Sequence, residues 1–129
     1  MPSLFLLFNH TLTAQQEADA HRSLGVAEVI APPPDISRLW AEIPPEADSL
    51  KEYLLPVMAW LTQTARPGDY VLVQGEFGAT WLVVNEAMAM GLVPIYATTR
   101  RVATERMLPT GQIEIQHVFQ HVRFRRYGY

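Results

Sequence analysis

The sequence contains no cysteine among its 129 residues, so disulfides, thiolate zinc sites and cysteine nucleophiles are excluded. Long hydrophobic runs are lacking as well. The apolar stretch Leu4–Phe8 is far too short to span a bilayer, and it has neither the basic flank nor the small-residue cleavage site of a signal peptide. We therefore expect a cytoplasmic protein that does not contact membranes, folded as a single domain over residues 1–129.

Lysine is almost absent, and the positive charge comes from arginine that is unevenly distributed. Residues 1–97 carry four basic and eleven acidic side chains, whereas residues 98–129 carry six arginines and two glutamates. The overall net charge of −3 argues against a general affinity for duplex nucleic acid. Arginine favours planar, bidentate recognition of phosphate or carboxylate. The pattern therefore indicates a small anionic ligand near the C-terminal third.

Strong local motifs are also missing: the chain has no GxGxxG, GxxxxGK[ST], HExxH or GxSxG pattern. His117 and His121 are four residues apart, but side chains with that spacing do not converge on a strand as they would on a helix. His21 is expected on a solvated helix face. We expect neither a metal site nor a cofactor.

The chain is organised around residues 69–101, which predict a strand, a loop, a helix and a second strand. Tyr70–Val73 is an apolar run typical of a strand buried on both faces. Two glycines then break the run. Ala79–Met90 is long enough for three helical turns and is followed by Gly91, a residue that suits a helix C-terminus. Val93–Ala97 predicts the second, parallel strand.

The N-terminal third predicts a similar unit. Ser3–Phe8 reads as a buried strand, and Thr13 with Gln16 forms a capping-box pattern ahead of a helix over Gln15–Leu24. Val26–Ile30 follows as a second short strand. Two such units predict an α/β fold with a mainly parallel sheet flanked by helices.

The remaining segments are assigned from periodicity and turn residues. A short helix is expected over Ile36–Ile43 and the longest helix over Ser49–Ala65, where Pro56 should kink it unless the helix begins later. Val102–Leu108 is expected to be helical. Alternating apolar residues from Ile113 onward predict a terminal strand or hairpin, a place where two subunits could meet.

Polar residues follow three of the predicted strands, at the edge where ligands bind in parallel sheets. The first group lies before a helix N-terminus, which favours anions. The second contains the two glycines, and the third contains paired arginines. The three groups are Asn9, His10 and Thr11; Gln74, Gly75, Glu76, Phe77 and Gly78; and Thr98, Thr99, Arg100 and Arg101.

Each group also has a structural explanation. The segment Gly75–Gly78 fits a tight turn between strand and helix, and the Glu76 carboxylate is favourable near a helix N-terminus without any ligand. His10 is either a general acid or base or a packed histidine at a strand end. Arg100 and Arg101 fit an exposed rim, and Thr98 and Thr99 fit the cap of a following helix.

Several segments together resemble a known family. FLLFNHTLT, LGV, ISRLWAEIPPE, YVLVQGEFGATWLVVNEAMAMGLVPIYATTRR and HVRFRRY are similar to the small Csx-type CRISPR-associated proteins of type III systems. These are stand-alone, CARF-like Rossmannoid domains. The resemblance covers nearly the whole chain, and its most specific part runs from Val71 to Arg101.

The resemblance implies a homodimer that binds a cyclic oligoadenylate, with cyclic tetra-adenylate as the favoured ring, across a two-fold axis. It also implies a metal-independent ring nuclease, in which a ribose 2′-OH attacks the adjacent phosphate and leaves a 2′,3′-cyclic phosphate. On this basis Arg100 or Arg101 would stabilise the phosphate, and Thr98 or Thr99 would orient it. His10 would protonate the leaving oxygen, and Gly75–Gly78 would shape the cradle, with Phe77 stacking on adenine.

Three rival functions remain open. One is a sponge or sensor that holds a cyclic oligoadenylate without cutting it, because preorganised donors serve binding and cleavage equally. The second is a small Rossmann-like enzyme acting on a mononucleotide or nucleotide sugar. The third is a structural subunit of a larger assembly, which the arginine-rich segment Arg123–Arg126 would allow.

Overall fold

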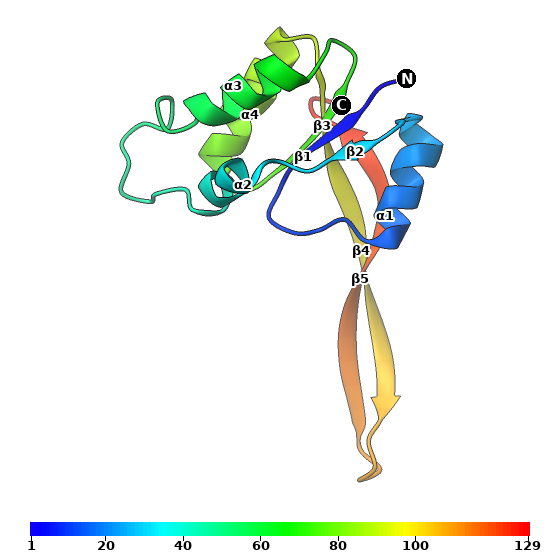
Figure 1. Cartoon of the computed structure of the whole chain (residues 1–129). Coiled ribbons are helices and arrows are strands. Elements are labelled where there is room, and N and C mark those ends of the chain that lie inside the picture. Colours follow the sequence, from blue (N-terminus) through cyan, green and yellow to red (C-terminus); the bar gives the residue numbers. More distant parts are fainter.

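A computed structural model describes all residues from Met1 to Tyr129 and contains one five-stranded sheet with helices on both faces (Figure 1). The first four strands run parallel, and the last runs antiparallel to its neighbour. In spatial order the strands are β2 (Val29–Ile30), β1 (Leu4–Phe8), β3 (Tyr70–Gln74), β4 (Val93–Met107) and β5 (Ile113–Arg126). The predicted α/β class with a mainly parallel sheet is thereby confirmed, although β5 makes the sheet partly antiparallel.

The helices connect the parallel strands in chain order. They are α1 (Ala14–Asp19), which continues into the π-helical turn η1 (Ala20–Leu24), then α2 (Pro34–Ala41), α3 (Leu55–Thr64) and α4 (Phe77–Ala89). The predicted capping box forms at the start of α1: the side chains of Thr13 and Gln16 each accept a hydrogen bond from the other's backbone N–H. No helix is long and apolar enough to cross a membrane.

The sheet separates two apolar layers, because successive side chains of a strand point to opposite faces. Phe5 and Leu7 of β1 belong to the larger cluster, which α2, α3 and α4 cover. Leu4 and Leu6 belong to the smaller one, beneath α1 and η1. Strands β1 and β3 are therefore buried on both sides, which explains their unbroken apolar sequences.

One helix and one strand begin later in the structure than the sequence predicts. The helix expected over Ser49–Ala65 begins only at Leu55, so Pro56 lies in its first turn, where its missing N–H costs nothing. As a result α4, not α3, is the longest helix. The strand expected over Val26–Ile30 is reduced to Val29 and Ile30, and it lies at the edge of the sheet.

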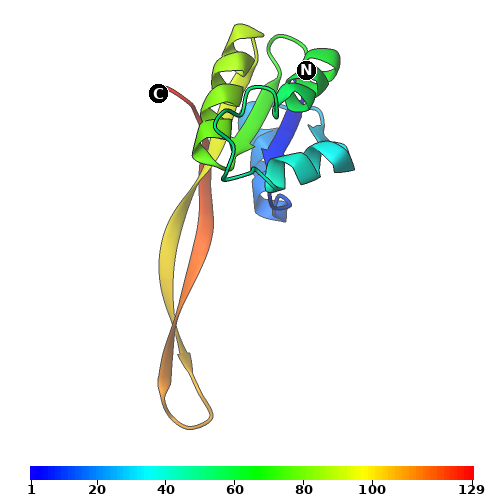
Figure 2. The same cartoon turned by 90° about the vertical axis from the view of Figure 1, so that its left-hand side faces the viewer.

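The largest difference concerns the segment after Arg101. The helix expected over Val102–Leu108 is wrong: β4 continues to Met107 and pairs with β5 along its whole length. The two strands leave the rest of the molecule as a long twisted hairpin (Figures 1 and 2). We call residues 99–121 the arm and the remainder the body. The arm begins at a β-bulge, where the register shifts between Thr98 and Thr99.

A buried ion pair joins the arm to the body. Nε2 of His121 in β5 lies 2.7 Å from a carboxylate oxygen of Asp19 in α1, and both side chains are almost completely buried. The other carboxylate oxygen of Asp19 accepts hydrogen bonds from Ser23 and Arg22. Phe124 packs next to His121, with ring centroids 4.8 Å apart. The direction of the arm is thus fixed at its root.

Candidate functional site

The carboxyl ends of β1 and β3 carry two hollows, and residues expected from the sequence line both. The first, of about 480 Å³, is lined by Asn9, His10 and Thr11 together with Phe8 and Ser37 among others. The second, of about 400 Å³, is lined by six residues: Gln74, Gly75, Phe77, Thr80, Tyr96 and Tyr127. Two of the three predicted polar groups therefore lie where ligands bind in parallel sheets.

His10 is exposed in the first hollow. Its ring meets Phe8 edge-on, with centroids 5.3 Å apart, and makes no hydrogen bond to the rest of the chain. The capping of α1 is done by Thr13, not by any residue of Asn9–Thr11. Both imidazole nitrogens of His10 are thus open to a ligand, so the ring can exchange a proton with one.

Glu76 performs the structural role that the sequence allowed for it. Its side chain accepts hydrogen bonds from the backbone N–H groups of Gly78 and Ala79 and caps α4. The donors at this helix start already have an anionic partner, so a phosphate placed there would meet a negative charge. Gly75–Gly78 therefore does not offer the open phosphate cradle expected from its glycines.

Neither Gly75 nor Gly78 has a positive φ, so the backbone conformation does not explain why glycine stands there. Close packing explains it at Gly75. A Cβ built on Gly75 would lie 2.8 Å from Nε1 of Trp40. The same indole N–H donates a 3.0 Å hydrogen bond to the carbonyl of Gln74. The Gln74 side chain, in turn, accepts from the N–H of Ala97 at 2.7 Å and joins β3 to β4. These contacts hold one wall of the second hollow rigid.

Aromatic rings form the opposite wall, and one guanidinium packs on them from outside the hollow. The rings of Tyr96 and Tyr127 have centroids 4.8 Å apart, and the guanidinium of Arg125 lies 5.6 Å from the Tyr96 centroid and donates to its hydroxyl. The Tyr127 hydroxyl donates to the carbonyl of Val73, and burial, reinforced by Tyr96, raises its pKa. Tyr127 is therefore a donor at neutral pH, not a base.

Two further features suit this hollow to a planar ligand. Phe77 is 93% exposed at its rim. Oγ1 of Thr80, a hollow-lining residue, is buried and has no hydrogen-bond partner. Aromatic faces stack on nucleobases without regard to sequence, and an unpaired hydroxyl can donate to or accept from the edge of a base.

Sequence reasoning missed Thr80, Tyr96 and Tyr127 as lining residues, and Arg125 beside them. Tyr96 could have been found from the sequence, because its ring carries a hydroxyl inside an otherwise apolar strand. Arg125 and Tyr127 reach the second hollow only through the antiparallel return of β5, in which Arg125 pairs with Tyr96, and Thr80 reaches it from the first turn of α4.

The third predicted group lies elsewhere than expected. Thr98–Arg101 do not follow the end of a strand, because β4 continues through them into the arm. Thr98 exchanges hydrogen bonds with the backbone of Arg123 on β5, at 2.9 and 3.2 Å, and so fastens the root of the arm. Thr99, Arg100 and Arg101 are exposed, and neither arginine has an acidic partner.

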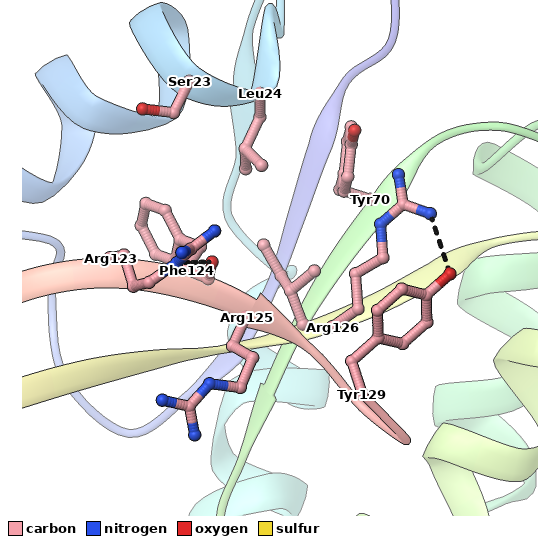
Figure 3. A pocket seen from close by; sticks show the side chains of 9 residues that line it. Ser23, Leu24, Tyr70, Arg123, Phe124, Arg125, Arg126 and Tyr129 are labelled. Carbon is pink, nitrogen blue, oxygen red and sulfur yellow. Dashed lines mark hydrogen bonds between the residues drawn. The ribbon is translucent and has the colours of Figure 1, made fainter.

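A third hollow, of about 490 Å³, lies at the root of the arm on the α1 side of the sheet (Figure 3). Arg126 projects into it toward Tyr70, and its guanidinium donates to the hydroxyl of Tyr129, a bond that raises the pKa of the arginine. Arg125, next along the strand, points to the opposite side. The sequence marked these arginines only as an exposed terminus.

Comparison with known proteins identifies relatives of the whole chain. The model of a family described as "Uncharacterized protein MJ1673 family" matches residues 2–125. A protein of Methanocaldococcus jannaschii, described as "Uncharacterized protein MJ1673", is 46% identical over 128 residues, which cover 99% of this chain and 98% of that protein. No solved structure matches the chain. The protein described here belongs to the MJ1673 family.

Proposed function

We propose that the protein is a Rossmann-like, CARF-like homodimer that binds a cyclic oligoadenylate, with cyclic tetra-adenylate as the favoured ring, and cleaves it without a metal. One observation carries this proposal: two neighbouring parallel strands each end in a hollow, one with an exposed histidine and the other with aromatic walls. A ligand that alternates phosphate and purine needs both kinds of surface.

The second hollow suits adenine. Phe77 and Tyr96 supply ring faces for stacking, and Thr80 supplies an unpaired hydroxyl at the wall. Arg125, held against Tyr96, adds positive charge beside the hollow. Two copies related by a two-fold axis would present two such hollows to a ring that itself has two-fold symmetry.

In the first hollow His10 serves as the general acid. The 2′-oxygen of a ribose forms a bond to the adjacent phosphorus while the bond from phosphorus to the 5′-oxygen breaks. The 2′-OH proton passes to water, and His10 in its protonated form gives a proton to the leaving 5′-oxygen. Asn9 and Thr11, on either side, hold the phosphate for in-line attack, and an arm arginine offsets the charge developing on its oxygens.

The test is incubation of the purified protein with labelled cyclic tetra-adenylate in EDTA, with intact ring and linear products resolved. Wild-type protein should yield linear di-adenylate with a 2′,3′-cyclic phosphate end. His10→Gln should lower the rate by about 10²-fold or more while leaving ring binding intact, because general acid catalysis contributes about that much.

His21→Gln provides the matched control. His21 is an exposed histidine on η1, outside both hollows, and should tolerate the change with full cleavage. An intact ring that is nevertheless retained by the protein would establish a sponge instead. A ring that is neither cut nor bound would refute the proposal.

A further inference from the structure

We propose that the arm of one copy packs against α4 of a second copy and carries Arg101 to the partner's carboxyl-edge site. The interface stands on the structure alone, whereas the role of Arg101 rests on the proposed function. Each copy would then complete the site of the other.

The arm lacks the support that a two-stranded hairpin requires. Such hairpins are marginal in water unless a further strand or helix covers one face. The register pairs Met107 with Ile113, Glu105 with Ile115, and Arg101 with Phe119, so these residues share one face. The four apolar members of that face are all exposed, with Phe119 at 69%. This face is the surface of the arm that a partner would cover.

A second apolar surface lies exposed on α4. Phe77 and Trp81 are 93% and 66% exposed, and their spacing of four residues puts them on the same side of the helix. Met88 extends this stripe by two further turns and is also exposed. Monomeric proteins seldom leave two such aromatic residues side by side in water. The chain therefore presents two separate apolar surfaces, each without a partner of its own.

Charge favours contact between arm and body over contact between two arms. The arm carries three arginines, Arg100, Arg101 and Arg106, against Glu105 and Glu114, whereas the body carries eleven acidic side chains against seven basic ones. α4 itself holds Glu86 and no basic residue, and Glu76 caps it. Two arms brought together would both have a net positive charge, while an arm on a partner's α4 meets a surface of net negative charge.

The arm is also long enough to reach across a second copy of the body. From Thr99 to Met107 the arm rises by about 27 Å at 3.3–3.4 Å per residue, comparable with the diameter of a small domain. The buried pair between Asp19 and His121 holds the arm in one direction. A two-fold axis makes the contact reciprocal, so that both arms and both copies of α4 are covered at once.

The same contact explains where Arg101 acts. Within one chain this arginine projects from the arm beyond the sheet edge, with no contact to either hollow. It pairs directly with Phe119, so any partner surface that receives Phe119 also receives Arg101. On the partner that surface includes Phe77, which lines the second hollow, and the first hollow with His10 lies at the end of the neighbouring strand β1. Arg100 points to the other side of the arm.

The interface is tested by sedimentation, independently of any nucleotide. Wild-type protein should have the mass of a dimer, and both Phe119→Ser and Trp81→Ser should shift it toward monomer by at least tenfold in dissociation constant. Val118→Ser is the control, because Val118 is exposed on the opposite face of the same strand. A dimer unaffected by both aromatic changes, or a monomeric wild type, would overturn the interface.

The role of Arg101 is tested by mixing two inactive variants, Arg101→Gln and His10→Gln. Random pairing makes half of the dimers mixed, each with one complete site, so about a quarter of the wild-type cleavage should return. An arginine acting within its own chain would restore none, and that result would refute the role in trans. Arg101→Gln should also reduce cleavage at least tenfold more than Arg100→Gln does. If the wild type binds the ring without cutting it, Arg101→Gln and Arg100→Gln are compared by retention of the ring.

Failure of the proposed function and failure of this inference are distinguishable. A dimer that dissociates on Phe119→Ser but ignores cyclic oligoadenylates would retain the interface and lose the proposed ligand. Ring cleavage by a monomer would support the proposed ligand and overturn the interface.

Discussion

The body and the arm are built from the same kinds of residue, but they use their apolar side chains in opposite ways. In the body, β1 and β3 are covered on both faces, and residues such as Leu4, Leu7 and Leu72 are completely buried. In the arm, apolar residues alternate just as regularly but remain in water. The body is therefore stable through its own contacts, whereas the arm has an apolar face that only another surface can bury.

This contrast is tested most strongly by removing one apolar side chain from each region. Leu72→Ala should lower the free energy of unfolding by about 2–5 kcal/mol, because it leaves a cavity in the central strand. Ile115→Ala should change the same quantity by less than about 0.5 kcal/mol in the monomer, since its side chain is exposed. Urea unfolding at low protein concentration measures both. Comparable losses would show that the arm is buried within its own chain.

Breaking the contact between arm and body should give the next largest loss of stability. Asp19→Asn should cost about 3 kcal/mol at neutral pH, because it leaves His121 without its buried partner. Burial raises the pKa of Asp19, but hydrogen bonds from Ser23, His121 and Arg22 outweigh it and hold that pKa below its usual range. A carboxyl group with a depressed pKa stabilises the fold above the pKa it has when unfolded.

The stability that Asp19 contributes should therefore be complete above about pH 5 and disappear as the pH falls below its usual pKa near 4. Unfolding by urea between pH 3 and pH 7 should show this loss in the wild type and a flatter profile in Asp19→Asn. Equal pH dependence in both proteins would contradict the assignment. Asp48→Asn provides a control, because its carboxylate is exposed and unpaired.

The smallest effect is expected at the loop that borders the second hollow. Gly75→Ala should lower stability by about 1–3 kcal/mol, because the new methyl group would meet the ring of Trp40 at 2.8–2.9 Å. Gly78→Ala meets the ends of two side chains, Glu76 at 3.2 Å and Leu50 at 3.7 Å, and gains helix propensity. It should be neutral or stabilising by thermal melting. The reverse order would mean that the glycines serve the ligand and not the packing.

The sequence predicts the body better than the arm, for a physical reason. Local apolar patterns specify strands β1 and β3 and helix α4. Gly91 has a positive φ just after the end of α4, as expected, and Gly25 plays the same part after η1. Val102–Leu108, in contrast, contains residues with good helix propensity. It becomes a strand only because β5, which follows in the sequence, pairs with it.

The candidate site, too, could be predicted only where local sequence patterns determine the structure. The two groups that follow β1 and β3 were placed correctly, since the end of a buried strand can be read from the sequence. Thr98–Arg101 were not, because the end of β4 depends on its partner strand. The unpaired hydroxyl of Thr80 and the tilted contact between the rings of Tyr96 and Tyr127 arise from tertiary packing alone, and no local sequence pattern predicts them.

The ion pair of Asp19 and His121 has a consequence for the order in which the chain folds. It joins residues 102 positions apart, so closing it requires nearly the whole chain to be in place. The β1–α1 segment emerges first from the ribosome, yet α1 acquires this partner only after β5 has been synthesised and paired. The orientation of the arm is thus set in one of the last steps of folding, after β5 has been synthesised.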